Sequence, residues 1–158
     1  APDGVHIDPK RMTQLEHIAW AVREVERMRP SVDMLMRTVK EDLPVGDYVV
    51  PQGWLAQVTQ DVAHNLPVLF EDPDTFDPLR YAPGRAEDKQ DRFALIGFGG
   101  GIHKCIGMNF ANMEMTVITA LLFRQFDLEL VTRHPQVERG LGASRPDKAV
   151  VRYRRRNP

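Results

Sequence analysis

The sequence predicts an α+β fold, mainly helical, built around two long helices. Two segments, at residues 12–29 and 107–126, combine apolar residues at helical spacing with a lack of internal helix breakers. Short β-prone runs follow the first segment and recur near the C-terminus. Between them, residues 65–93 are charged and contain four prolines. Such long irregular segments are usually functional or disordered.

Each element has its own signal along the chain. The first helix has apolar residues at Leu15, Ile18 and Val22 and ends before Pro30. The runs "MLMRTV", "YVVP" and "WLAQVTQDV" predict strands, and "DLPVGD" and "PQG" predict the turns between them. After the irregular segment and a glycine-rich stretch comes the second helix, with a predicted apolar face that includes Phe110 and Met113. Two further strand-like runs, "DLELV" and "KAVVRYRRR", close the chain.

Bulk composition narrows the class of protein. The chain has 158 residues, 42% of them apolar, which indicates one globular domain. Its net charge of −1 gives no reason to expect nucleic acid or an anionic membrane as a partner. A single cysteine excludes an internal disulfide framework. No apolar run reaches the roughly 18 residues of a membrane span. We therefore expect a soluble, cytoplasmic protein, and the initial Ala suggests a processed or excised piece.

The stretch "FGGGIHKC", residues 98–105, carries the only cysteine. A phosphate-binding P-loop is excluded, because His103 and Cys105 flank Lys104 where that motif needs Gly and Ser or Thr. A structural zinc site is disfavoured, because zinc normally takes four N or S ligands and only scattered histidines accompany Cys105. His103 is a poor base for a cysteine nucleophile, since such partners usually come from distant parts of a chain.

Two interpretations of this stretch remain. Cys105 could be a small buried residue after a tight turn. Alternatively it is a thiolate ligand to haem iron, since glycines let the backbone approach a flat macrocycle closely. A helix that starts at residues 106–107 would direct its N–H groups and positive dipole end towards the sulfur and stabilise the thiolate.

Three motifs decide between these interpretations. "FGGGIHKCIG" resembles the cysteine-loop signature of cytochrome P-450 haem-thiolate monooxygenases, Phe-x-x-Gly-x-Arg/His-x-Cys-x-Gly. "REVERMRP" is similar to the Glu-x-x-Arg motif of that family's K helix, and "FDPLRY" to its meander motif. The residues in register with the cysteine-loop signature are Phe98, Gly101, His103, Cys105 and Gly107.

The resemblance implies a role for each of these residues. Cys105 would be the axial ligand of the iron of haem b, and Phe98, Gly101 and Gly107 would belong to the haem-binding loop. Glu24, Arg27 and Arg80 would form a buried ion-pair triad that anchors the meander, because two guanidinium groups can saturate one carboxylate. On its own, Glu-x-x-Arg is usually an exposed helix pair that contributes only a few tenths of a kcal/mol.

"MLMRTV", "RYAPGRAEDK" and "VRYRRR" further resemble the sterol 14α-demethylase branch, especially its soluble bacterial members. That likeness implies a sterol-like, small hydrophobic substrate. Arg37 and His103 would hold the haem propionates. Met34 and Leu35 would face the distal substrate cavity, with core packing as the alternative. A ferredoxin or flavoprotein reductase would donate electrons near Arg23 and Lys104. For His64 we expect a structural hydrogen bond.

The resemblance covers only the C-terminal part of the family fold, so residues 1–158 would be a single partial domain. Nothing in the sequence resembles the N-terminal helices or the distal I helix, whose polar residues relay protons to oxygen. We therefore assign no catalytic residue to this chain. Three functions remain open: the haem-ligating part of a monooxygenase completed by another segment, a non-catalytic haem-binding module, and an inactive fragment.

Overall fold

The computed structural model describes residues 13–32, 34–139 and 143–156 and has the mixed α+β architecture that the sequence predicts. The helices are α2 (Glu16–Met28), α3 (Gln60–His64) and α4 (Met108–Gln125), with three short 3-10 helices, η1 (Pro78–Tyr81), η2 (Glu87–Lys89) and η3 (Gly101–His103). Neither α2 nor α4 contains Gly or Pro. Among the described residues, no helix is long and apolar enough to cross a membrane.

The strands of the described ranges pair only as two-stranded antiparallel ladders. Strand β1 (Met34–Thr38) pairs with β4 (Leu55–Thr59), and between them β2 (Leu43–Val45) and β3 (Tyr48–Val50) form a tight hairpin. Strand β5 (Phe126–Leu130) pairs with β8 (Val151–Arg155), and β6 (Val137–Arg139) with β7 (Ser144–Pro146). Each ladder therefore leaves two open edges and buries little by itself.

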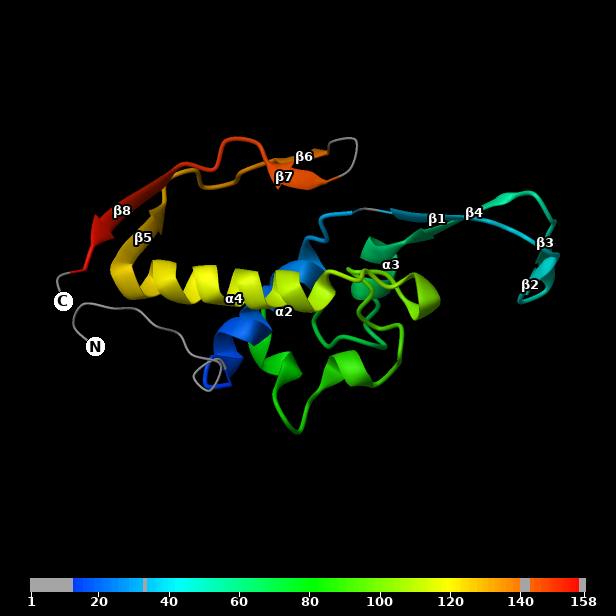
Figure 1. Ribbon diagram of the computed structural model, residues 1–158, viewed down its shortest axis with the longest axis horizontal. Helices are drawn as coiled ribbons and strands as arrows, with labels where there is room; N and C mark the ends of the chain where they lie inside the picture. The colour runs from blue at the N-terminus through cyan, green and yellow to red at the C-terminus, as the bar shows by residue number, and fades with distance from the viewer. Residues whose placement is uncertain (1–12, 33, 140–142, 157–158) are drawn as a thin grey trace.

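Helix α4 forms the middle of an elongated molecule (Figure 1). Helix α2 crosses α4, the irregular segment that contains η1 and η2 lies on one side of α4 in this view, and the β6–β7 hairpin lies on the other. The β1–β4 ladder, with β2–β3 at its tip, extends away beyond the N-terminal end of α4. At the opposite end of α4, the β5–β8 ladder joins it directly, because β5 starts at Phe126 where α4 ends.

The core of the described residues is small and unusually polar. Its buried apolar side chains are Val39, Phe70, Tyr81, Ala94 and Ile96. Charged side chains are buried beside them: Glu24, Arg27 and Arg80 are each 0% exposed, and Arg27 and Arg80 are the largest of the fully buried side chains. An ion-pair cluster therefore replaces much of the apolar core between α2 and the irregular segment.

Large apolar side chains are exposed elsewhere. Phe110 on α4 is 63% exposed, Trp54 before β4 is 63% exposed, and Ile106 is fully exposed. Exposed large apolar side chains indicate a site of interaction where they lie together, because ordinary surfaces keep apolar patches small. The sequence predicted an apolar face of the second helix that includes Phe110 and Met113, but in the structure both side chains are exposed.

Two local predictions are wrong, and two strands were not predicted. The strand predicted over residues 54–62 stops at Thr59, and Gln60–His64 is a helix because Gln60 and His64 make buried tertiary hydrogen bonds. The "DLPVGD" stretch is not only a turn, since Leu43–Val45 is a strand. Strands β6 and β7 were not predicted, because their polar sequences carry no alternating apolar pattern.

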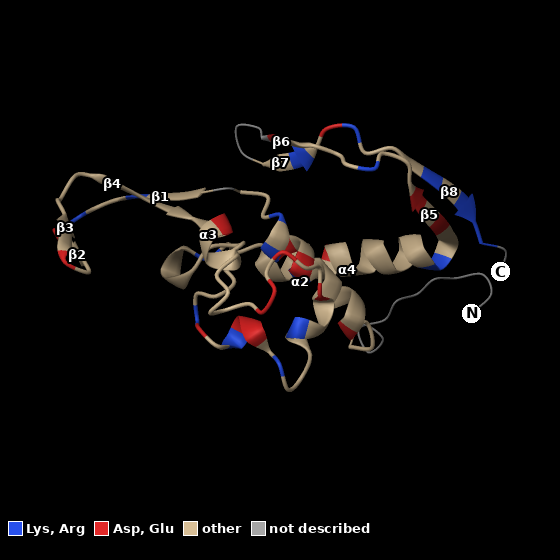
Figure 2. Ribbon diagram, turned by 180° about the vertical axis from the view of Figure 1, so that it is seen from behind, with Lys and Arg blue, Asp and Glu red and all other residues tan. Residues whose placement is uncertain are grey.

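Cross-strand charges stabilise the C-terminal ladder. Arg152 on β8 pairs with Glu129 on β5 at 2.7 Å, and Arg154 pairs with Asp127 at 3.0 Å. Figure 2 shows acidic positions on β5 beside basic positions on β8. The terminal "RYRRR" is therefore a solvated strand with partly neutralised charge, and exposed pairs of this kind each contribute about 0–1 kcal/mol.

Candidate functional site

A buried carboxylate, Glu24 on α2, is the centre of the ion-pair cluster. Arg27, one helical turn later, donates to both of its oxygens, from Nη2 at 2.9 Å and from Nε at 3.0 Å. Arg80 of η1 donates from Nε at 3.1 Å to each oxygen. The structure thus brings together the three residues of the triad implied by the resemblance, although Glu24 and Arg80 are 56 positions apart.

Two further donors complete the coordination of this carboxylate. The Tyr81 hydroxyl donates to Glu24 Oε2 at 3.0 Å, and the backbone N–H of Asp77 donates to Oε1 at 3.1 Å. Burial by itself would raise the pKa of Glu24, but the hydrogen bonds from Arg27, Asp77 and Tyr81 and the charge of Arg27 outweigh it and hold that pKa below its usual value. Glu24 is therefore ionised at neutral pH.

Both arginines also donate to backbone carbonyls of the irregular segment. Arg27 donates to the carbonyls of His64 at 2.8 Å and Pro73 at 2.7 Å. Arg80 donates to the carbonyls of Glu71 at 2.9 Å and Thr75 at 3.1 Å. One pair of guanidinium groups therefore fixes the path of residues 64–75 as well as neutralising Glu24.

An outer layer of charge surrounds Arg80. Glu87 of η2 accepts from Arg80 Nη1 at 2.6 Å and from the backbone N–H of Glu71 at 3.1 Å. Arg85 bridges Glu87 and Asp77. Sequence reasoning missed Tyr81, Asp77, Arg85 and Glu87, because charged and aromatic residues in an irregular segment follow no periodic pattern that would place them around Arg80.

His64 of α3 links α2 to the cysteine loop. The backbone N–H of Ile96 donates to Nε2 at 2.9 Å, so the proton of the neutral ring lies on Nδ1, which is 3.0 Å from the carbonyl of Arg27. Burial lowers the pKa of His64, partly opposed by the hydrogen bond to Arg27. The expected structural hydrogen bond of His64 is confirmed, and the ring joins two segments that each carry a predicted site motif.

The cysteine loop (residues 98–105) is a closed turn immediately before α4. The backbone N–H of Cys105 donates to the carbonyl of Phe98 at 2.8 Å. Gly99 has φ of +78°, and a Cβ there would lie 3.1 Å from the carbonyl oxygen of His103, so this turn requires glycine. Gly101, with φ of +61°, begins η3. The loop therefore places Cys105 two residues before Gly107, the N-cap of α4.

The residues around Cys105 fit a haem group. The thiol is exposed, and a Cβ at Gly107, the N-cap of α4, would lie 3.7 Å from its sulfur. The unbonded N–H groups of the first turn of α4 favour a negative sulfur. Ile102 and Ile106 on either side are exposed apolar side chains. A soft sulfur ligand within an apolar, glycine-rich surface suits a flat macrocycle that contains iron.

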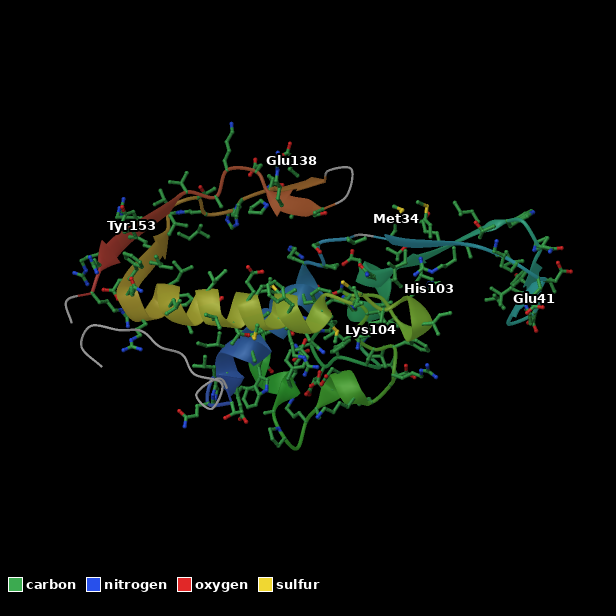
Figure 3. All side chains as sticks on the ribbon, in the orientation of Figure 1. Met34, Glu41, His103, Lys104, Glu138 and Tyr153 are labelled. Carbon is green, nitrogen blue, oxygen red and sulfur yellow. The ribbon has the colours of Figure 1, made fainter. Side chains whose placement is uncertain are left out.

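The other predicted haem and substrate residues lie on two separate elements. His103, in η3, and Lys104 are exposed on the cysteine loop, whereas Met34 lies on β1 (Figure 3). Arg37 is also on β1 and exposed, and its guanidinium donates to the carbonyl of Met36 at 2.7 Å. Leu35 is half-buried on the same strand. Within the described residues, no contact joins Arg37 to His103, so the roles at the propionates and at the substrate remain predictions.

Comparison with known proteins gives the class to which this fold and site belong. The family model described as Cytochrome P450 matches residues 3–151. A sterol 14-demethylase of Arabidopsis thaliana is 36% identical over 163 residues, covering 99% of this chain and 33% of the relative. A sterol 14alpha-demethylase of Mycolicibacterium vanbaalenii is 31% identical, covering 98% of this chain and 35% of the relative.

Solved structures agree with this family. The retinoic acid bound cyanobacterial CYP120A1 matches with a TM-score of 0.88 and 26% identity, over 97% of this chain and 35% of that one. The chain belongs to the cytochrome P450 family, as the three motifs predicted, and the family implies a haem cofactor. It spans about a third of the length of the curated relatives that it matches.

Proposed function

We propose that this chain is the haem-ligating C-terminal part of a cytochrome P450 monooxygenase that acts on a small hydrophobic, sterol-like substrate. The observation that carries the proposal is the exposed Cys105 thiol just before the N-terminus of α4, at the end of a loop that contains two glycines with positive φ. The relatives named sterol 14-demethylase support the substrate class. Residues 1–158 would form one partial domain of that enzyme.

The residues of this chain would hold haem b in two ways. Cys105 would ligate the iron, with Phe98, Gly101 and Gly107 shaping the surface beneath the ring and His103 and Arg37 directed to the propionates. The haem would supply iron redox chemistry, and a thiolate ligand favours O–O cleavage. The Glu24, Arg27 and Arg80 cluster would act indirectly, because it fixes the irregular segment that leads into the cysteine loop.

Substrate binding and oxygen activation would need the rest of the fold. Such chemistry requires ordered proton delivery and exclusion of water. In this chain Ile106, Phe110 and Trp54 are exposed instead. We propose that the N-terminal part of the same fold covers these side chains, either from the same polypeptide or from a separate one. Met34 and Leu35 would then line the distal cavity.

An electron donor would bind on the side of the cysteine loop away from the haem. Arg23 and Lys104 would present positive charge there to an acidic ferredoxin or flavoprotein reductase. The reaction needs such a donor because insertion of one oxygen atom leaves the other to be reduced to water. Within the described residues no helix could span a membrane, which is compatible with the cytoplasmic location we propose.

A spectroscopic experiment tests the ligand. The reduced, carbon monoxide-bound protein should show the Soret band characteristic of thiolate ligation, and Cys105→Ala should lose it. Cys105→Ser should lose this band as well, since it nearly keeps the size of the side chain and removes the soft ligand, and it therefore controls for the loss of side-chain volume in Cys105→Ala. A well-folded wild-type protein that stays colourless when expressed with abundant haem would refute the proposal.

Turnover separates the two functions that share this ligand. A monooxygenase should hydroxylate a sterol when an electron donor, oxygen and the N-terminal part of the fold are supplied, whereas a haem-binding module would show the same spectrum without turnover. The exposed Phe110 of α4 favours the monooxygenase, because a self-sufficient module would not leave so large an apolar side chain uncovered. Loss of both spectrum and fold would indicate an inactive fragment.

A further inference from the structure

A second carboxyl group, that of Glu26 on α2, lies beneath the cysteine loop. Glu26 is half-buried and packs directly against the backbone of Gly97. A Cβ added at Gly97 would lie 2.4 Å from both Cγ and Oε1 of Glu26. The carboxyl group therefore occupies the space that any other residue at position 97 would need for its side chain.

The environment of Glu26 is the opposite of that of Glu24, two residues earlier. Among the described residues, Glu26 makes no hydrogen bond and no ion pair. Burial raises its pKa to about 7, opposed by the charges of Arg23 and Lys104 and reinforced by that of Asp88. These three groups come from α2, the cysteine loop and η2, the elements around the carboxyl group. The half-buried position of Glu26 against Gly97 therefore favours its protonated form more than water does.

The backbone at this point is held from another side. Gln60 of α3 donates from Nε2 to the carbonyl of Ile96 at 2.8 Å and to that of Gly97 at 3.3 Å. The N–H of Ile96 is bound to His64. When Glu26 loses its proton, the loop is thus less free to adapt than the side chain of Glu26, which has three rotatable bonds.

Positive charge is available just outside this buried position. The Arg23 side chain is 39% exposed and pairs with Asp88 at 3.1 Å, and Lys104 is exposed on the cysteine loop. We propose that Glu26 is a pH switch beneath the cysteine loop: the protonated side chain lies against Gly97, and the ionised side chain turns outward beside Arg23 and Lys104. Ionisation would then add a negative charge to this surface.

The consequence for electron transfer rests on the proposed function. If an acidic donor binds at Arg23 and Lys104, its affinity should fall as the pH rises through neutrality, because ionised Glu26 weakens the positive potential of that surface. This dependence is opposite in sign to that expected from protonation of the donor's own carboxylates at low pH.

Infrared difference spectroscopy of the purified protein tests the switch without haem or a partner. Between about pH 6 and about pH 9, the wild type should lose the C=O stretch of one protonated carboxyl group, with a midpoint of about 7. Glu26→Gln should abolish this change. Glu41→Gln is the matched control, at the far tip of the β1–β4 ladder (Figure 3), and should leave it intact.

Gly97→Ala provides the complementary perturbation, because its Cβ forces Glu26 outward. The carboxyl midpoint should then fall to the ordinary range for Glu, about 4.3. The proposal is overturned if the neutral-pH signal is absent from the wild type, survives in Glu26→Gln, or keeps its midpoint in a folded Gly97→Ala protein. If Gly97→Ala does not fold, the Glu26→Gln comparison alone decides.

A ferredoxin titration then tests the link to electron transfer. The affinity of a [2Fe–2S] ferredoxin should fall several-fold between about pH 6 and about pH 8 for the wild type and change less for Glu26→Gln. An identical pH dependence in both proteins overturns that link but leaves the infrared result, so the switch and the proposed function fail separately.

Discussion

Replacing Arg27 with Ala removes one of the two guanidinium groups that bind the buried carboxylate of Glu24. Arg27 donates to both oxygens of Glu24 and to the carbonyls of His64 and Pro73, and its guanidinium lies 5.3 Å from the ring centroid of Phe70. The Arg27 and Glu24 side chains are both 0% exposed, so water does not reach the groups left behind. The variant therefore loses an ion pair and leaves two backbone acceptors without that donor.

The magnitude follows from what remains around the carboxylate. Breaking a buried ion pair by removing one partner typically destabilises a protein by about 3–5 kcal/mol. Arg80, Tyr81 and the N–H of Asp77 still bind Glu24, which limits the loss from the charge. The carbonyls of His64 and Pro73, which lose a donor, increase the loss of stability by about 1–3 kcal/mol each when fully buried. We expect a loss of about 3–5 kcal/mol, a large part of the ~5–15 kcal/mol stability of a typical domain.

Urea unfolding followed by circular dichroism measures this loss. Arg29→Ala is the matched control, because Arg29 directly follows α2 and is exposed, and among the described residues its side chain donates only to the carbonyl of Met28. It should change the free energy of unfolding by about 0.5 kcal/mol or less. Arg27→Lys keeps the charge without the bidentate fork and should lie between the two. An Arg27→Ala protein within about 1 kcal/mol of the wild type would contradict the reasoning.

Two further outcomes follow from the same region. Tyr81→Phe removes one hydrogen bond to a carboxylate that keeps other donors, so we expect a loss of about 1.5 kcal/mol in urea unfolding, and no measurable loss would mean that the hydroxyl is dispensable to Glu24. Burial lowers the pKa of His64 below its usual 6.5, so the unfolded chain binds a proton that the folded one excludes, and stability should fall as the pH drops below about 6.5. The difference in unfolding free energy between the wild type and His64→Gln, measured across that range, should shrink towards low pH, and a constant difference would exclude a neutral buried ring.

The sequence predicted the helices and the motifs well, for physical reasons. Helix α2 and helix α4 lack Gly and Pro and carry periodic apolar residues, which are local signals. The cysteine loop combines glycines with the only cysteine of the chain, and this spacing is specific enough to indicate the family that the comparisons then showed. The fold class and the family were therefore accessible without coordinates.

Helix α3 shows where local signals failed. Residues 60–64 follow a β-prone run without a break, and only buried hydrogen bonds from Gln60 and His64 to distant backbone groups favour the helix. The exposure of Phe110 was equally hidden, because periodicity identifies an apolar face but not whether anything in the chain covers it.

By itself, the sequence determined which residue types stand at motif positions: one thiol after a glycine turn, and Glu24 one helical turn before Arg27. Tertiary structure alone decided the surroundings of each carboxyl group. Glu24 meets Arg80, Tyr81 and the Asp77 amide, whereas Glu26 meets the bare backbone of Gly97. The two side chains share one helix, but Glu24 has donors 53 and 56 positions away in addition to Arg27, whereas Glu26 is desolvated against Gly97 without a donor among the described residues, and no local pattern encodes either environment.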